Sequence, residues 1–537
     1  MTDPKSVRTI PQLVRAAAET YGDAPAIIDG DLELSFAELA ERVSTAARGF
    51  IALGLMPGDR VGIWAPNSHR WVIAALGVLS AGGTVVPLNT RYRGAEAREF
   101  LARTQARCIV VEQGFLGYDH LGSVFDEATE DGTEWSLDAL EILVDVGTSG
   151  LAAAGGHAVT PWGALLEAAE TITPEQGLKV ANAVMSEDLS DIIFTSGTTG
   201  RAKGVQLTHG APLQLYVTYG EIWGIKPGDR YLIVLPFFHG GGNKAGMILS
   251  IMFGVTIVPM AVFDAAAAMA EIERRGISVM NGSPTIYTSI LDHPDRGKYD
   301  LSTLRVAATG AAVVPAHLVE RARTELPFQN FITAYGLTEC CGTATMCRQG
   351  DPEEVVNTTN GRALPDVEVV IVDPSGKQLG PDEPGEVWIR GFNVSPGYWQ
   401  DPVATAEAID EDGWLHSGDI GELTAEGNLR ITDRLKDLFI VGGFNVSPAE
   451  VEQVLVRHPA VSEVSVIGVP DERLGEVARA YVIPKHGVTL DPDEMIVWSR
   501  ERLANFKVPR SIVVVESLPR NASGKVLKRE LRKAVAE

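Results

Sequence analysis

Short apolar runs alternate with longer helical stretches along most of the chain. Asp191–Phe194 is one such run, in which residues suited to a buried strand lead into a polar, glycine-containing segment. The stretch Ala265–Ile277 has instead the pattern of a helix. Strands that alternate with helices are typical of largely parallel sheets covered by helices, so we predict an α/β fold. The runs expected to form strands are Arg60–Asn67, Arg107–Glu112, Asp191–Gly197, Arg230–Phe238, Val255–Met260 and Leu304–Gly310.

The pattern changes after Arg390, where shorter strands and turns replace the earlier alternation and a basic helix closes the chain. We therefore predict a compact α/β domain of about one hundred residues at the C-terminus. Its boundary should fall within Thr432–Asp437, which divides the chain into a large N-terminal domain, residues 1–434, and a small C-terminal domain, residues 435–537.

One uncharged run, Ala245–Phe263, is about as long as a bilayer crossing requires. Gly254 and Pro259 interrupt it, and each of these residues disfavours a continuous helix. A buried helix followed by a short Val/Ile strand fits the run better than a membrane span.

Composition narrows the class of partner. The 537 residues are 45% hydrophobic, which is enough to fill a large core in two or more domains. The chain has 46 Lys and Arg residues and 70 Asp and Glu residues, which gives a net charge of -24. A protein that binds nucleic acid or an anionic membrane surface is therefore disfavoured. Any bound anion must therefore be held by local groups.

Cysteine usage and the N-terminal residues indicate the compartment. Cys340, Cys341 and Cys347 crowd one segment while Cys108 stands apart, which suggests neither zinc spacing nor a disulfide framework. The first residues carry charges and a proline where a signal peptide would need an apolar stretch. We expect a cytoplasmic protein.

The polar segment Thr195–Gly204, "TSGTTGRAKG", has the composition of a phosphate-binding loop. Its glycines allow backbone N–H groups to turn toward one point, its hydroxyls add donors, and Arg201 and Lys203 add positive charge. The common P-loop pattern does not fit, because glycine follows Lys203. Taken alone, the segment fits a polar surface loop equally well.

Five motifs that occur in a fixed order favour the phosphate-binding loop over the surface loop. Together they resemble the adenylate-forming superfamily of acyl-CoA synthetases, aryl-CoA ligases, luciferases and peptide-synthetase adenylation domains, over nearly the whole chain. The motifs are "TSGTTGRAKGV" at Thr195, "YGLTE" at Tyr335, "GWLHSGDIG" at Gly413, "RITDRLKDLFIVGGFNVSPAEVE" at Arg430 and "PRNASGKVLKRELR" at Pro519.

The resemblance implies a two-step reaction that uses ATP, Mg²⁺ and coenzyme A. A carboxylate attacks the α-phosphorus of ATP and expels pyrophosphate, and a thiol then attacks the carbonyl of the acyl-adenylate. Negative charge builds on the phosphoryl oxygens in the first step, so cations and donors must be in place beforehand. A large N-terminal domain and a small mobile C-terminal domain are also implied.

The same resemblance assigns the residues that would contact the reacting carboxylate, the phosphates and Mg²⁺. Lys525 matches the mobile lysine that bridges the substrate carboxylate and the α-phosphate, although the residues alone fit a solvated lysine on a surface turn. Glu339 matches the carboxylate that helps to hold Mg²⁺. Thr338 beside it matches a contact to phosphate or adenylate.

The nucleotide-binding residues follow from the matched motifs. Asp419 and Arg434 match the pair that engages the ribose hydroxyls, with a surface ion pair as the plainer interpretation. Tyr335 would stack on adenine. Small residues are expected beside that base, and Gly336 belongs to the same motif as Tyr335. The residues expected to bind adenine and the phosphates are Gly310, Ala311, Ala312, Tyr335, Gly336, Thr195, Ser196, Gly197, Thr198, Thr199, Gly200 and Lys203.

Rotation of the C-terminal domain would serve the second step. Lys436 matches the hinge position, where a charged and exposed pivot can absorb a backbone change. Gly442 and Gly443 would then approach the site and leave room for pantetheine.

The acyl pocket is expected near "PFFHGGGNKAG". His239 is the candidate gate, and Phe238-His239 in place of an aspartate disfavours an amino acid substrate. The glycines Gly240–Gly242 suggest a roomy pocket mouth. Lys244 is interpreted as a solvated lysine at a helix start, with contact to a polar end of the substrate as the alternative.

Similarity is greatest to actinobacterial ligases of fatty acids and steroid-derived acids, although Gly240–Asn243 departs from their pattern. We therefore expect an acid-thiol ligase for a fatty acid or a bulky alicyclic acid. Its partners would be a small carboxylic acid and neither nucleic acid nor membrane, and a homodimer is left open. The alternatives are an acyl-AMP ligase that loads a carrier-protein pantetheine and a non-catalytic nucleotide-binding regulator.

Overall fold

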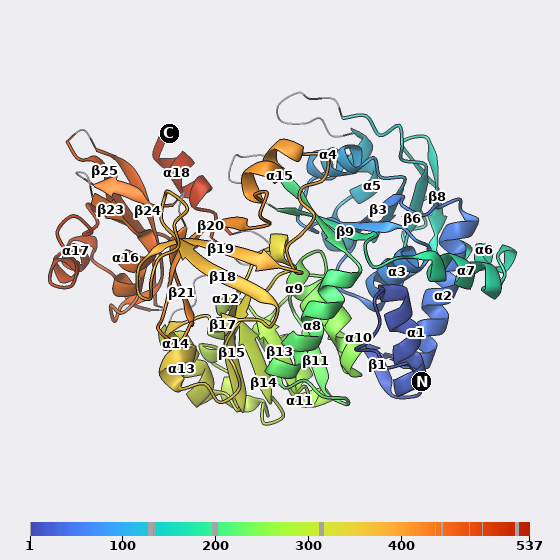
Figure 1. Cartoon of the computed structure of the whole chain (residues 1–537), viewed down its shortest axis with the longest axis horizontal. Coiled ribbons are helices and arrows are strands. Elements are labelled where there is room, and N and C mark those ends of the chain that lie inside the picture. Colours follow the sequence, from blue (N-terminus) through green and yellow to red (C-terminus); the bar gives the residue numbers. More distant parts are fainter. Residues whose placement is uncertain are drawn as a thin grey trace.

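In the residues that it describes, a computed structural model shows three sheets in the first four-fifths of the chain and a five-stranded sheet at the C-terminal end (Figure 1). It describes residues 2–126, 133, 135–195, 202–310, 316–434, 437–441, 444–471, 473–485, 487–520 and 526–536, with the backbone alone at 316–317, 433–434, 444–445 and 535–536. These residues confirm the α/β fold that the sequence predicts.

The largest sheet holds the strands that position most of the candidate site. Those from β1 to β15 through its centre are parallel, and each of the predicted runs Arg230–Phe238, Val255–Met260 and Leu304–Gly310 contains one of them. In spatial order the strands are β17 (Arg362–Ala363), β16 (Thr345–Met346), β15 (Asn330–Tyr335), β14 (Val306–Thr309), β13 (Val279–Gly282), β11 (Arg230–Ile233), β12 (Thr256–Pro259), β1 (Pro25–Asp29) and β2 (Leu32–Ser35).

The second sheet contains the other three predicted strands. Its centre is also parallel, and it ends in an antiparallel hairpin of β9 and β10. Its strands are β10 (Lys203–Thr208), β9 (Leu189–Thr195), β4 (Thr84–Pro87), β3 (Arg60–Trp64), β5 (Cys108–Val111), β6 (Ile142–Asp145), β8 (His157–Pro161) and β7 (Ala153–Ala154).

Helices cover these two sheets, and local signals set their ends. The predicted helix appears as α11 (Ala265–Arg275): Asp264 accepts a hydrogen bond from the Ala267 N–H, and Gly276, at φ 61°, ends it. Apart from α9 and α10, which are given below, the other α-helices described in this part are α1 (Ile10–Tyr21), α2 (Phe36–Ala52), α3 (His69–Ser80), α4 (Gly94–Thr104), α5 (His120–Asp126), α6 (Trp162–Ala168), α7 (Pro174–Ala183), α8 (Gly210–Trp223), α12 (Pro284–Leu291), α13 (Ala316–Glu325), α14 (Glu353–Thr358) and α15 (Pro402–Ala408).

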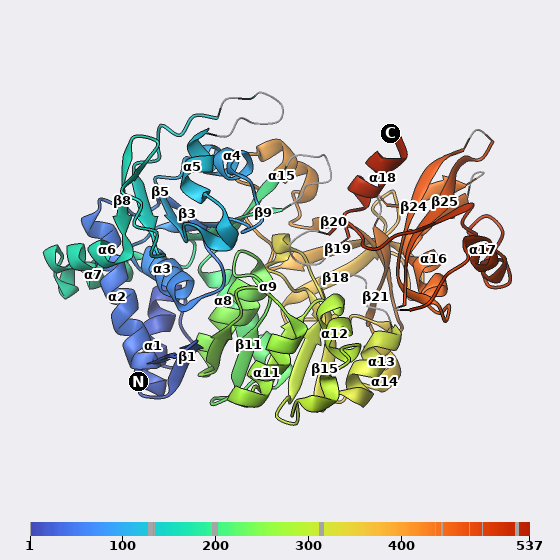
Figure 2. The ribbon, with the colours of Figure 1, turned by 180° about the vertical axis from the view of Figure 1, so that it is seen from behind.

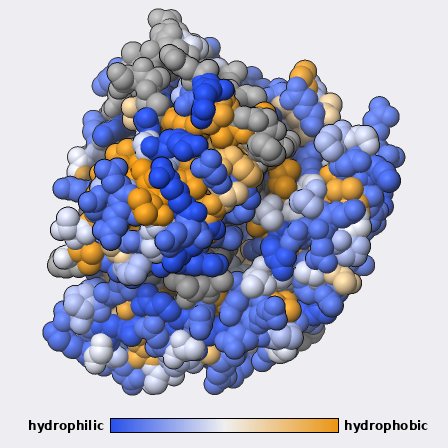
Figure 3. All heavy atoms as spheres, turned by 90° about the vertical axis from the view of Figure 1, so that its left-hand side faces the viewer, coloured by the Kyte–Doolittle hydropathy of each residue, from blue (hydrophilic) through white to orange (hydrophobic). Residues whose placement is uncertain are grey.

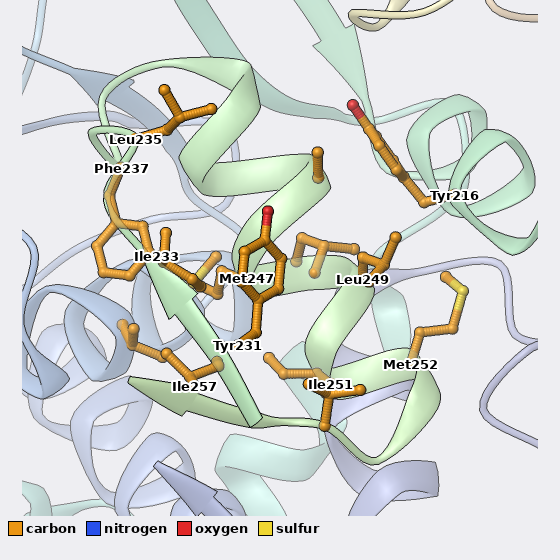
Figure 4. Close-up of a cluster of buried hydrophobic side chains, with 14 of the residues drawn as sticks. Tyr216, Tyr231, Ile233, Leu235, Phe237, Met247, Leu249, Ile251, Met252 and Ile257 are labelled. Carbon is orange, nitrogen blue, oxygen red and sulfur yellow. The ribbon is translucent and has the colours of Figure 1, made fainter. Parts of the chain in front are cut away.

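The long uncharged run is buried from Ala245 to Val258, where the sequence predicts a buried helix and strand, whereas its end is more exposed, with Val262 at 44%. It forms the end of a π-helix, η3 (Asn243–Ile248), then α10 (Leu249–Phe253) and the strand β12, with Gly254 in the left-handed conformation between them. Figure 4 shows these side chains packed with Tyr231 of β11 and Tyr216 of α8. Across the described residues, the helices are all too short or too polar to serve as a bilayer span.

Two further sheets lie toward the C-terminus. In Figures 1 and 2 the last sheet occupies one end of the molecule, beside the four-stranded sheet. The four-stranded sheet is β18 (Val367–Val372), β19 (Gly385–Gly391), β20 (Leu415–Leu423) and β21 (Leu429–Arg434), and the last is β23 (Phe444–Val446), β22 (Phe439–Val441), β25 (Gly475–Pro484), β24 (Val461–Asp471) and β26 (Ser511–Val514), with helices α16 (Pro448–Leu455), α17 (Pro492–Arg500) and α18 (Lys528–Ala536).

The apolar side chains of the last sheet form a core of their own, from Phe439 to Leu531, whereas the main cluster of the earlier sheets runs from Ile10 to Leu429. The end face seen in Figure 3 is mixed, and apolar atoms gather on it among hydrophilic ones. Ile440 and Val497 are among the exposed apolar side chains of the C-terminal part. A domain boundary after residue 434 stays a prediction, because residues 435 and 436 lie outside the described residues.

Candidate active site

The candidate site lies along one edge of the largest sheet. Strands β11, β13, β14 and β15 run parallel, so their carboxyl ends meet at the same edge, where open α/β sheets bind ligands. The segments that leave these ends carry His239 after β11, Gly310 after β14, and Tyr335 with the "GLTE" residues at the end of β15. Residues predicted from separate motifs are thereby brought to one edge.

Glu339 lies in a short 3₁₀ turn, η5 (Thr338–Cys340), immediately after β15. Its carboxylate oxygen Oε1 accepts a hydrogen bond from the hydroxyl of Tyr398 at 2.9 Å, and its backbone carbonyl accepts one from the Ser395 N–H at 2.8 Å. Thr338 contributes its carbonyl to the turn, where it accepts from the Cys341 N–H at 3.1 Å. Residues of the segment that follows β19 therefore hold both this turn and the Glu339 carboxylate in place.

The hairpin of β9 and β10 presents the two ends of the predicted phosphate loop. Thr195 and Lys203 are partners across the two strands. The ammonium of Lys203 lies 4.9 Å from the centroid of the Tyr398 ring. The loop residues Ser196, Gly197, Thr198, Thr199 and Gly200, which the sequence assigns to the cradle, lie outside the described residues.

Asp419 and Arg434, predicted as a pair, are partners in the register of β20 and β21. Asp419 is 4% exposed, and its Oδ2 accepts a hydrogen bond from the Tyr335 hydroxyl at 2.8 Å. Burial, with the nearby charge of Asp419, raises the pKa of Tyr335 well above its ordinary value, so the phenol stays protonated and remains a donor. The side chain of Arg434 lies outside the described residues.

At two of the predicted nucleotide-binding glycines, the neighbouring backbone leaves no room for a side chain. A Cβ at Gly336 would lie 2.5 Å from the Gly342 carbonyl oxygen, and one at Gly310 would lie 2.9 Å from that of Ala334. Larger residues would therefore displace the loops that leave β14 and β15. Ala311 and Ala312 lie outside the described residues.

His239 begins the short helix α9 (Gly240–Gly242) after β11. Its Nδ1 accepts a hydrogen bond from the Gly241 N–H at 3.1 Å, so the ring caps this turn. A Cβ at Gly242 would collide with the carbonyl oxygens of Leu235 and Pro236, so this glycine serves a tight turn and does not open space. The gating role of His239 stays a prediction.

The expectation that Lys244 is solvated is wrong. Lys244 is fully buried, and its ammonium forms an ion pair with the carboxylate of Asp191 at the start of β9. The same carboxylate accepts from the Asn243 amide at 3.0 Å and from the Ser190 hydroxyl at 2.6 Å. A buried lysine must be paired with an opposite charge. The sequence does offer a candidate partner, because Asp191 is a carboxylate at the start of an apolar run that is expected to be buried. The alternative contact with a substrate end fits no better.

The predicted residues of the C-terminal part, Lys436, Gly442, Gly443 and Lys525, lie outside the described residues. The segment before Lys525 nevertheless reaches the candidate edge: a guanidinium nitrogen of Arg520 lies 3.5 Å from the hydroxyl of Thr285, on α12 directly after β13. This contact joins the last sheet to the same edge as Tyr335 and Glu339.

Sequence reasoning missed Tyr398, Thr285 and Arg520. Tyr398 stands in "SPGYW", where a Pro-Gly turn after a strand is followed by two aromatic residues. Large aromatic side chains at a turn are a signal for a packing or binding role, but they do not identify their partners. Glu339 is 59 residues away in sequence, so only the fold reveals that contact.

Comparisons with known proteins extend over nearly the whole chain. The family model described as AMP-binding enzyme matches residues 14–399, and that described as AMP-binding enzyme C-terminal domain matches residues 450–525. A protein of Rhodococcus jostii is 48% identical over 98% of both chains, and one of Mycobacterium tuberculosis is 46% identical over 98% of this chain and 99% of its own.

Both of these relatives are named as CoA ligases for a propanoyl chain on a 7a-methyl-1,5-dioxo-octahydro-1H-inden-4-yl ring. Among solved structures, ATP-bound MatB from Rhodopseudomonas palustris is 28% identical, with a TM-score of 0.78 over 98% of both chains.

Proposed function

The chain belongs to the AMP-binding enzyme family and is an acid-thiol ligase that works through an acyl-adenylate, and on that premise we propose that its acid is a fused-ring alicyclic propanoate. In the first step a carboxylate oxygen bonds to the α-phosphorus of ATP and pyrophosphate leaves. In the second the sulfur of coenzyme A bonds to the acyl carbonyl, its proton is lost, and AMP leaves.

The described residues are suited to holding ATP. Asp419, with Tyr335 donating to it, offers a buried carboxylate to the ribose hydroxyls, and Lys203 brings positive charge to the end of the phosphate hairpin. Three sheets contribute: Tyr335 at the end of β15 contacts Asp419 of β20, and Tyr398 links Glu339 after β15 to Lys203 of β10. This convergence at the carboxyl end of β15 is the observation that supports the proposed nucleotide site.

The chemistry of Glu339 fits Mg²⁺. A carboxylate is the hard oxygen ligand that Mg²⁺ prefers, and the remaining ligands of this ion commonly come from substrate phosphates and water. Glu339 would hold the ion, which would neutralise charge on the phosphates. The Tyr398 hydroxyl at 2.9 Å orients the carboxylate for this role.

We assign the first step's mobile cation to Lys525. The support is the contact of Arg520 with Thr285, which brings the chain preceding Lys525 to the candidate edge. An ammonium there would lie between the approaching carboxylate and the α-phosphate, where negative charge accumulates. We place the enzyme in the cytoplasm, because its four cysteines are free thiols.

Lys525→Ala tests the assignment. It should lower acid-dependent ATP–pyrophosphate exchange at least about a hundredfold, the effect of removing one prepared electrostatic contact. Lys533→Ala is the matched control, because it removes a lysine of the nearby helix α18 that is 64% exposed and 3.5 Å from Glu530. Near-normal exchange in Lys525→Ala would refute the role of Lys525.

A panel of acids tests the proposed substrate class. Short, medium and long fatty acids, aromatic acids and fused-ring propanoates are supplied with ATP and coenzyme A, and CoA-dependent AMP release is measured. We expect kcat/KM for a fused-ring propanoate to exceed that for any linear acid by about tenfold or more, because filling a shaped apolar pocket contributes one to several kcal/mol. A higher value for a linear acid would reject the class.

A further inference from the structure

Tyr398 contacts two groups of opposite charge that come from different sheets. Its hydroxyl donates to Glu339 after β15, and its ring faces the ammonium of Lys203 on β10. We propose that Tyr398 is a positioning residue that fixes the carboxylate and the ammonium relative to one another before the metal–nucleotide complex binds. This inference rests on the proposed function, which assigns Glu339 to Mg²⁺ and Lys203 to phosphate.

The backbone around Tyr398 is fixed to the phosphate hairpin. Val205 and Tyr398 form an antiparallel bridge. On either side of it, the Trp399 N–H donates to the Gly204 carbonyl at 2.7 Å, and the Gln206 N–H donates to the Gly397 carbonyl at 3.1 Å. Residues 397–399 therefore continue the second sheet beyond its edge strand, and the tyrosine moves with the hairpin.

The preceding residues are fixed to the turn that carries Glu339. The Ser395 N–H donates to the Glu339 carbonyl at 2.8 Å. The fully buried amide of Asn393 donates to the carbonyls of Cys340, at 3.3 Å, and Thr343, at 3.0 Å. Because both ends of this short segment, residues 393–399, are held, the position of Tyr398 is set independently of its own side-chain contacts.

The chemistry of the phenol suits a positioning role. The Tyr398 hydroxyl has a proton to donate, and its partner at 2.9 Å, the Glu339 carboxylate, is an acceptor. Donation to Oε1 restricts rotation of the carboxylate and so fixes the direction of its oxygens toward a metal. The ring restrains the long side chain of Lys203 through its electron-rich face. Groups held in this way are oriented before the ligand arrives.

Four variants separate this role from packing, and one of them, Glu339→Gln, is the reference for the double variant. Tyr398→Phe removes only the hydroxyl, Tyr398→Met also removes the ring, and Tyr398→Phe combined with Glu339→Gln tests whether the hydroxyl acts through the carboxylate. Trp399→Phe is the matched control, because the Trp399 indole donates to the Arg103 carbonyl at 3.1 Å, away from both charged groups.

The measurement is calorimetric binding of a non-hydrolysable ATP analogue, once with excess Mg²⁺ and once with EDTA. In Tyr398→Phe the gain in affinity due to Mg²⁺ should fall about tenfold or more, the effect of losing one hydrogen bond to a charged group, while metal-free binding stays within about twofold. Tyr398→Met should also weaken metal-free binding about threefold, through Lys203. Trp399→Phe should change neither quantity.

The double variant should bind no more weakly than Glu339→Gln alone. An unchanged Mg²⁺ gain in Tyr398→Phe, or additive losses in the double variant, would overturn the inference. Unfolding of both single Tyr398 variants would overturn it too, since a packing role would then suffice. If the wild type binds no analogue at all, the proposed function fails first, and the two failures are therefore distinguishable.

Discussion

His209, at the N-terminal end of α8, is a buried residue whose charge state affects stability. It is 1% exposed, and its Nδ1 accepts a hydrogen bond from the Ile10 N–H at 3.3 Å. Burial, followed by the nearby ammonium of Lys244, lowers the pKa of His209 from 6.5 to about 4. The folded protein thus keeps this imidazole neutral at pH values where an unfolded chain would protonate it.

The consequence is a loss of stability in acid. Between pH 6.5 and 4 the unfolded state binds the additional proton, so the free energy of unfolding falls as the pH falls through this window. The loss between pH 7 and pH 5 attributable to His209 should be about 2 kcal/mol. His209→Asn, which keeps an acceptor and cannot be protonated, should remove that part of the loss.

Urea unfolding at pH 7 and pH 5 measures this loss of stability in the wild type and in His209→Asn. The control is His293→Asn, because His293 is partly exposed and likewise accepts a backbone hydrogen bond, from the Asp295 N–H at 3.1 Å. Equal pH dependence in the wild type and His209→Asn would contradict the burial argument.

The candidate site shows which residues local sequence can identify. Asp419 and Arg434 lie in adjacent matched motifs, and their pairing could be predicted although the register of β20 and β21 could not. Lys244 was misassigned, because its burial depends on Asp191, 53 residues earlier in the chain. A contact of that kind is decided by tertiary packing, which leaves no local pattern in the sequence.

Among the elements, β9 and the π-helix η3 are joined by the buried pair of Asp191 and Lys244. An ion pair in the interior adds little net stability, but removing one partner leaves a buried charge. Lys244→Met should therefore lower the free energy of unfolding by about 3 kcal/mol or more. Combining it with Asp191→Leu should restore most of that loss, since no unpaired charge remains.

Urea denaturation of the single and double variants provides the test. Lys298→Met is the control for loss of a lysine as such, because Lys298 is 74% exposed in its pair with Asp295, and the change there should stay below about 1 kcal/mol. A fully stable Lys244→Met, or a double variant worse than the single one, would contradict the account.

Elements with local signals were predicted well. Both ends of α11 follow from Asp264 and Gly276, and β11, β12 and β14 follow from their apolar runs. The π-helix was not predicted, because its widened turn accompanies the packing of Asn243 and Lys244 against Asp191. That geometry depends on a neighbouring strand, so helix periodicity alone does not reveal it.

On the scale of the whole molecule, polar contacts join the C-terminal sheet to the remainder. The Arg520 guanidinium approaches Thr285, and the Ser447 hydroxyl donates to the Thr432 carbonyl at 3.3 Å. Asp437 is held by Arg532 of α18 at 3.0 Å, within the C-terminal part itself. A separate apolar core with polar contacts to its neighbour favours movement of this part as a unit.

A proline at the proposed hinge tests such movement. Lys436→Pro should leave ATP–pyrophosphate exchange within about threefold of the wild type while slowing acyl-CoA formation by roughly tenfold, because it restricts the backbone rotation needed only for the second step. Lys436→Ala removes the charge but leaves the backbone free and serves as the control. Equal losses in both steps would argue against domain rotation.

The bridge between Val205 and Tyr398 also constrains when the site can form during synthesis. The ribosome completes the β9–β10 hairpin long before it reaches residue 398, so the edge of the second sheet stays uncovered while the intervening chain is made. An uncovered edge invites wrong pairing with other chains. Nascent chains stalled before residue 399 should therefore depend more on chaperones than longer ones, and should acquire nucleotide binding only after this segment has emerged.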